Sequence, residues 1–210
     1  MSQSTDPTSE HRPSPTASPG FGSRISDPGP LGLAGFAGTT LFLSCVNAGL
    51  LPAGVTAGVF GLAIFYGGIA QLLAGLWEFT KGNTFGSTAF VSYGAFWLSF
   101  WFLNTHTTFE GSPSDINHAV GTYLLVWTIF TAYMFIASLR TTGAIAAVFL
   151  ALALTFLFLT IGKYGDSSGI TKVGGYIGLV TAALAFYGSF AAVTNETFKK
   201  TVLPVVPLAR

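Results

Sequence analysis

The feature that most constrains this chain is the length of its uncharged apolar stretches. No Asp, Glu, Lys or Arg occurs between Asp27 and Glu78, or between Arg140 and Lys163. Only 8% of the 210 residues are charged, and 50% are hydrophobic. A soluble domain carries about 25% charged residues, because they are needed to cover its surface. The sequence therefore predicts an all-α integral membrane protein, since helices satisfy their own backbone groups in lipid.

Six segments are apolar and long enough to span a bilayer, which takes about 20 residues. They cover residues 31–51, 55–79, 84–104, 118–139, 143–162 and 173–194. Short linkers rich in Gly, Pro, Asn and Asp separate them, as is typical of turns. We therefore expect antiparallel neighbours in one transmembrane domain at 31–195.

The segments outside this domain are predicted to be cytoplasmic tails. Residues 1–30 are rich in Ser, Pro and Gly and too poor in apolar residues to fold alone, so we expect a disordered tail. Residues 196–210 form a short second tail. With both tails inside, most Lys and Arg residues outside 1–20 fall on the cytoplasmic side, as the positive-inside rule requires: Arg24, Lys81, Arg140, Lys199 and Lys200. Lys163 and Lys172 are then outside, and the protein is predicted to be a multi-pass protein of the plasma membrane.

Polar and small residues form stripes at helical spacing inside the first two segments. The first stripe is Phe36, Thr40, Ser44 and Asn47, and the second is Gly67, Gln71, Gly75 and Glu78. An unpaired polar group in hydrocarbon costs several kcal/mol. Such groups either bond to neighbouring helices or replace the water of a solute in a pore, and the pattern leaves both interpretations open.

Glu78 and Lys81 also allow two interpretations. They are three residues apart on a predicted helix, so they could form an ion pair at the membrane interface. Alternatively, Glu78 faces the vestibule of a pore.

The sequence contains no recognisable catalytic or metal-binding arrangement. His106 and His118, with Glu110 and Asp115, fit no standard metal template. The net charge of +1 gives no footprint for nucleic acid. We therefore expect no enzyme activity, cofactor, metal or nucleic-acid partner. An intramembrane enzyme and a non-transporting sensor or structural protein are the rival classes to a transporter.

Three segments resemble the acetate uptake transporters, also called succinate–acetate permeases. They are "DPGPLGLAGF" at 27–36, "FYGGIAQLLAGLWEFTKGNTFGSTAFVSYGAFW" at 65–97 and "NETFKKTVLP" at 195–204. The resemblance implies a six-helix protomer with its own pore, assembled into a homohexamer. It also implies transport of acetate and other short monocarboxylates, in some members succinate, commonly with protons.

The resemblance also implies particular site residues. A hydrophobic constriction falls on Phe36, Tyr93 and Leu152, where the Tyr93 hydroxyl could hold the carboxylate. The polar positions of the predicted helices themselves suggest Thr40, Asn47, Gln71, Thr88 and Ser92 as candidate solute-binding residues, and Gln71 also matches a polar position of the family motif. Glu78 is the candidate proton carrier, because a carboxyl that loses its water becomes easier to protonate.

One position departs from the family pattern. Asp27, at the predicted pore entrance, stands where the family has Asn. An ionised Asp27 would repel an anion, so we expect it to be protonated or paired, or else the substrate preference differs. Another small solute, such as ammonia or urea, is the alternative within the transport class.

Overall fold

Helices make up nearly all of the ordered structure in the computed structural model, which describes residues 25–208. The rods are α1 Gly29–Asn47, a composite rod Ala53–Thr80, α4 Thr84–Thr105, α5 Pro113–Ser138, α6 Gly143–Tyr164 and α7 Ser168–Phe198. The composite rod consists of the 3-10 segment η2 Ala53–Val59, α2 Phe60–Ile64, the π-helical segment η3 Phe65–Ala70 and α3 Gln71–Thr80.

Five of these six rods are long and apolar enough to cross a membrane by length and composition. The sixth, α4, has 22 residues and is long enough, but Thr, Ser, Tyr and Trp residues make it less apolar. The structure therefore supports an all-α protein with five to six apolar helices.

The predicted helix boundaries were wrong at several ends, for a local reason. The first helix ends at Asn47 rather than at 51, because Gly49 takes a left-handed conformation with φ 78°. α5 begins at Pro113 rather than at 118, because Ser112 and Asp115 form a reciprocal capping box. α7 extends beyond 173–194 in both directions. Hydropathy misses such polar helix ends.

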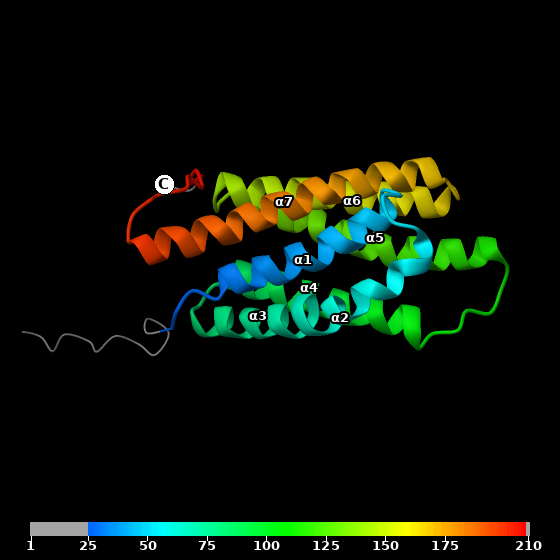
Figure 1. Cartoon of the computed structure of the whole chain (residues 1–210), viewed down its shortest axis with the longest axis horizontal. Coiled ribbons are helices and arrows are strands. Elements are labelled where there is room, and N and C mark those ends of the chain that lie inside the picture. The colour runs from blue at the N-terminus through cyan, green and yellow to red at the C-terminus, as the bar shows by residue number, and fades with distance from the viewer. Residues whose placement is uncertain (1–24, 209–210) are drawn as a thin grey trace, which may run out of the picture.

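The helices form two groups on either side of α1 (Figure 1). On one side α1 packs against α7, which packs against α6, and α6 packs against α5. On the other side α1 contacts η3 and α3, which pack against α4. The first and last described residues lie at one end of this bundle, while the loop between α6 and α7 lies at the other. Of the sequence prediction for 1–30, residues 1–24 lie outside the described part.

Two glycines make the π-helical segment η3 possible. A Cβ on Gly68 would lie 2.4 Å from the carbonyl oxygen of Ala63, and one on Gly67 would lie 2.5 Å from the hydroxyl of Thr39. A side chain at either position would collide with its neighbours. The wider π turn is a local feature that often accompanies functional sites in helices, and here it brings the backbone close to α1.

The residues after α7 turn back along the bundle. Lys199 ends the helix in a left-handed conformation with φ 53°. The Asn195 amide then holds the segment: its Nδ2 donates to the carbonyl of Leu203 at 2.8 Å, and its Oδ1 accepts from the Val202 amide at 2.7 Å. Further along, the carbonyl of Val206 accepts from the first amide of α6, at Gly143, at 2.7 Å. The segment thus supplies acceptors to a helix N-terminus that would otherwise lack them.

Candidate functional site

A cavity of about 690 Å³ enters the bundle at the end where α6 meets α7. Its walls come from α1, α4, α5, α6 and α7, and its deepest lining residues include Phe36 and Leu152. We call this cavity the vestibule. It is long enough to join the surface of the bundle to the buried core.

One wall of the vestibule is the polar stripe of α1. All four residues of this stripe line it: Phe36, Thr40, Ser44 and Asn47. They therefore share one face of α1, as their helical spacing predicted. Thr155 on α6 faces the same space, and its hydroxyl is bonded to that of Thr181 at 3.2 Å. The vestibule wall is therefore mixed, with hydroxyl and amide groups beside aromatic rings.

The structure brings the three predicted constriction residues into one buried cluster. Phe36, Tyr93 and Leu152 are 4%, 3% and 3% exposed. The rings of Phe36 and Tyr93 lie 5.6 Å apart between centroids. The Tyr93 hydroxyl is hydrogen-bonded to Thr131 at 2.9 Å, in a buried contact between α4 and α5. Tyr93 therefore contributes its ring to the cluster while its hydroxyl already has a protein partner.

Three buried polar side-chain atoms have no hydrogen-bond partner within residues 25–208: Thr40 Oγ1, Gln71 Oε1 and Trp97 Nε1. Thr40 and Trp97 line the vestibule. Leaving a buried polar group unpaired costs about 1–3 kcal/mol, so such groups are suited to bind a solute or water. Trp97 was missed by sequence reasoning, because an aromatic residue in an apolar helix carries no signal of an unpaired N–H group.

The other predicted solute-binding residues, Gln71, Thr88 and Ser92, do not line the vestibule. Gln71 is buried but does not line the vestibule, and Gly67 and Gly75 on the same face pack closely against Trp97 and Val91. The second predicted stripe is therefore mainly a packing surface. Thr88 and Ser92 are half-buried on α4 and also lie outside the vestibule lining.

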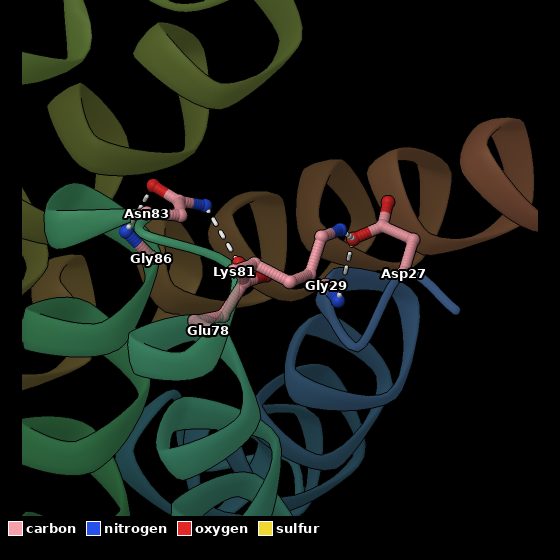
Figure 2. Close-up of polar contacts among 6 residues, drawn as sticks. All are labelled: Asp27, Gly29, Glu78, Lys81, Asn83 and Gly86. Atoms are coloured by element: carbon pink, nitrogen blue, oxygen red, sulfur yellow. Dashed lines mark hydrogen bonds and ion pairs between the residues drawn. The ribbon is translucent and has the colours of Figure 1, made fainter. Parts of the chain in front are cut away.

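At the opposite end of the bundle, four predicted or neighbouring polar residues form two separate pairs (Figure 2). Lys81 Nζ donates to Asp27 Oδ1 at 3.0 Å, and Asn83 Nδ2 donates to Glu78 Oε2 at 2.8 Å. Asn83 Oδ1 in turn accepts from the Gly86 amide at 3.0 Å and caps α4. We call Asp27, Glu78, Lys81 and Asn83 the polar closure.

The contacts of these residues exclude one of the two interpretations of Glu78, the ion pair with Lys81, and Glu78 does not line the vestibule either. Lys81 pairs with Asp27 and not with Glu78, so the predicted Glu78–Lys81 ion pair is not formed. Asp27 is paired, which is one of the outcomes expected for an acidic residue at this position. Glu78 is only 2% exposed and has Asn83 as its hydrogen-bond partner.

Residues 25–208 contain no group of three or more His, Cys, Asp or Glu side chains that could hold a metal ion. His106 lies against Trp101 and Phe102, and His118 lies against Tyr164, each in an aromatic contact. The chemistry that the site offers is therefore hydrogen bonding, apolar contact and charge.

Comparison with known proteins identifies the family from residues 10–210, which match the GPR1/FUN34/yaaH family. The chain belongs to this family. The succinate-acetate/proton symporter SatP of Escherichia coli strain K12 is 39% identical, over 87% of this chain and 96% of that protein. The ammonia transport outward protein 2 of Saccharomyces cerevisiae is 40% identical over 82% of this chain. The chain spans 63% of the length of the yeast proteins that it matches.

A solved structure has the same fold. The bacterial acetate channel SatP superposes on this family member with a TM-score of 0.79 at 39% sequence identity, covering 87% of this chain and 99% of the other. The resemblance expected from the three sequence segments is thus confirmed. The similarity extends to the whole helical bundle.

Proposed function

We propose that this protein moves acetate and related short monocarboxylates across a membrane, through a narrow path within each protomer. The observation that carries the proposal is the vestibule, which reaches Phe36 and Leu152 of the buried cluster, while Tyr93 lies behind them and is not among its lining residues. The fold shared with a bacterial acetate channel supports the same conclusion. Succinate is a further candidate substrate, because the bacterial relative SatP is named as a succinate-acetate/proton symporter.

The walls of the vestibule suit a small amphiphilic solute. The carboxylate can exchange water for polar side chains that line the vestibule, such as Asn47 and Ser44. The methyl group then meets the apolar side chains of Phe36 and Leu152. Because a charge is costly in apolar surroundings, the protonated acid should pass the cluster of Phe36, Tyr93 and Leu152 most easily.

Glu78 is the proposed proton-coupling residue. It is a carboxyl almost fully removed from solvent, and its Asn83 partner is a neutral donor rather than a cation. Such a group can exchange a proton without breaking an ion pair. Gln71 lies two turns before Glu78 on the same helix face. It is the proposed polar contact for the solute beyond the cluster of Phe36, Tyr93 and Leu152.

The arrangement in the membrane belongs to the same proposal. We place both tails in the cytoplasm and the protein in the plasma membrane, because Lys81, Arg140, Lys199 and Lys200 gather at one end. The family resemblance supports a homohexamer. Measuring the mass of the purified protein in lipid nanodiscs tests that assembly, and six copies are expected.

The decisive experiment is flux of labelled acetate into proteoliposomes that contain the purified full chain as the only protein. We expect uptake above that of protein-free liposomes, with imposed proton gradients altering its rate if transport is coupled. No acetate flux in liposomes that contain folded protein would contradict the proposal.

Ammonia is the second candidate, because a yeast relative carries the name of an ammonia transporter. A pH-sensitive dye inside the same liposomes distinguishes the two. Ammonia entry raises the internal pH after an ammonium pulse, whereas entry of acetic acid lowers it after an acetate pulse. An ammonium response without an acetate response would favour this alternative.

A further inference from the structure

Two lysines line the mouth of the vestibule. Lys163 is in the last turn of α6 and is half-buried, while Lys172 is near the start of α7 and is exposed. Both lie at the end of the bundle opposite to Lys81, Arg140, Lys199 and Lys200. On the proposed orientation they are outside, where the positive-inside rule disfavours lysine. Their position therefore does not follow from membrane orientation alone.

Neither lysine has a carboxylate within ion-pair distance in the described part of the chain. The two ion pairs found there join Lys81 to Asp27 and Lys199 to Glu196, both at the other end. The vestibule lining includes a single carboxylate, that of Asp166, and its Oδ1 accepts from Asn117 Nδ2 at 2.9 Å. The lining therefore carries an excess of one positive charge.

The other carboxylates and the histidines near this end do not line the vestibule, and Tyr123 is the further titratable residue of its lining. Asp115 accepts from the hydroxyl and amide of Ser112 at the start of α5. Glu110, His106 and His118 are likewise absent from the lining residues.

We call the buried cluster of Phe36, Tyr93 and Leu152 the waist. The polarity of the vestibule lining falls in order from the mouth to this waist. The lysine ammonium groups come first, then the neutral amide of Asn47 and the hydroxyl of Thr40, and finally the rings around Phe36. A mouth built for a neutral molecule gains nothing from unpaired ammonium groups. A mouth built for an anion gains a higher local concentration of solute, since a charged cleft steers opposite charges inward.

We propose that Lys163 and Lys172 form a recruitment site for the ionised carboxylate at the vestibule mouth. The proposal rests on the proposed transport function and adds the chemical form of the captured solute: the carboxylate enters the vestibule as an anion. Any protonation of the solute then occurs after it has passed the lysines. The two lysines set the apparent affinity for external carboxylate, whereas the waist sets the maximal rate.

The test compares Lys163→Gln, Lys172→Gln and the double variant with the unaltered protein, as labelled acetate uptake into proteoliposomes at pH 7. We expect KM for acetate to rise by roughly three- to tenfold in the double variant, with the maximal rate within about twofold. Raising the ionic strength should increase KM of the unaltered protein and leave that of the double variant nearly unchanged, because salt screens exposed charges.

Three controls separate charge from structure. Lys172→Arg keeps the charge and should keep KM, and Lys200→Gln removes a lysine at the other end and should have no effect. Acetamide has the shape of acetate without its charge, so its inhibition of acetate uptake should be equal in all variants. If acetamide inhibition weakens together with acetate affinity, the lysines act through structure and the proposal is wrong.

The outcomes distinguish this proposal from the function on which it rests. Absence of acetate flux in the unaltered protein contradicts the transport function itself. Normal flux in the unaltered protein, with unchanged KM and salt response in the double variant, overturns only the recruitment site.

Discussion

Both ends of the bundle contain charged residues, but within residues 25–208 ion pairs form only at the end opposite to the vestibule, where Arg140 and Lys200 nevertheless have no carboxylate partner. At the vestibule mouth, Lys163 and Lys172 have no carboxylate partner in residues 25–208 and face an open cavity. At the other end, Lys81 is bonded to Asp27, and Glu78 is bonded to Asn83 within the polar closure. The contrast teaches that charge alone does not indicate a solute site. A charge that is bonded within the protein is held by its partner, while an unpaired charge that lines a cavity can act on a solute.

The waist separates these two ends. Widening it should have the largest effect on transport. Phe36→Ala is expected to raise the flux of carboxylates larger than acetate by roughly tenfold or more, because the ring limits the width of the path. The measurement is uptake of labelled acetate, butyrate and benzoate into proteoliposomes.

Met134→Ala is the matched control for the waist. Met134 is also 4% exposed and belongs to the same core cluster, but it does not line the vestibule. It should lower thermal stability, as large-to-small core changes do, without changing the solute size limit. An unchanged size limit in Phe36→Ala would remove Phe36 from the proposed constriction.

The polar closure should govern how transport responds to pH. In the unaltered protein we expect acetate uptake to rise as the external pH falls, because protons that Glu78 would carry with the solute are then more abundant. Glu78→Gln keeps a side-chain oxygen that can accept from Asn83 but cannot take up a proton. We expect this variant to reduce the pH dependence to less than about twofold between pH 5 and 7.

Glu196→Gln controls for loss of a carboxylate at the same end of the molecule, since Glu196 is exposed and pairs only with Lys199 there. Its pH response should match that of the unaltered protein. A full pH response in Glu78→Gln would exclude Glu78 as the proton carrier.

Breaking the ion pair of the polar closure should have a smaller effect. Lys81→Gln leaves Asp27 as an unpaired anion beside the start of α1, so we expect acetate uptake to fall by about two- to threefold, as suits a partly exposed pair. Adding Asp27→Asn should restore the rate, because the repelling charge is then gone. Initial uptake rates of the single and double variants measure this, and a double variant as slow as Lys81→Gln would argue against repulsion.

The smallest effect on transport is expected at the C-terminal segment. Asn195→Ala removes three hydrogen bonds, to Val202 and Leu203, and should lower the free energy of unfolding by about 1–2 kcal/mol. Acetate flux should be unchanged, since Asn195 does not line the vestibule. Thermal unfolding in detergent measures the stability, and a flux defect larger than the loss of folded protein would connect this segment to transport.

Local physics allowed much of this protein to be predicted from its sequence. Apolar length identified the helical segments, and the spacing of Phe36, Thr40, Ser44 and Asn47 predicted their common face, which lines the vestibule. Motif resemblance identified the family and placed Phe36, Tyr93 and Leu152 in one buried cluster. These properties depend on residues close in sequence or on long matched segments.

Tertiary structure alone decided which polar groups meet. Lys81 could reach Glu78 along its own helix, yet it bonds to Asp27, which is distant in sequence. Gln71 shared a polar stripe with Glu78 but lies outside the vestibule lining, while Trp97 joins that lining with an unpaired N–H. The physical reason is that hydrophobic periodicity fixes which face of a helix is buried, whereas the rotation and crossing of neighbouring helices fix what that face contacts.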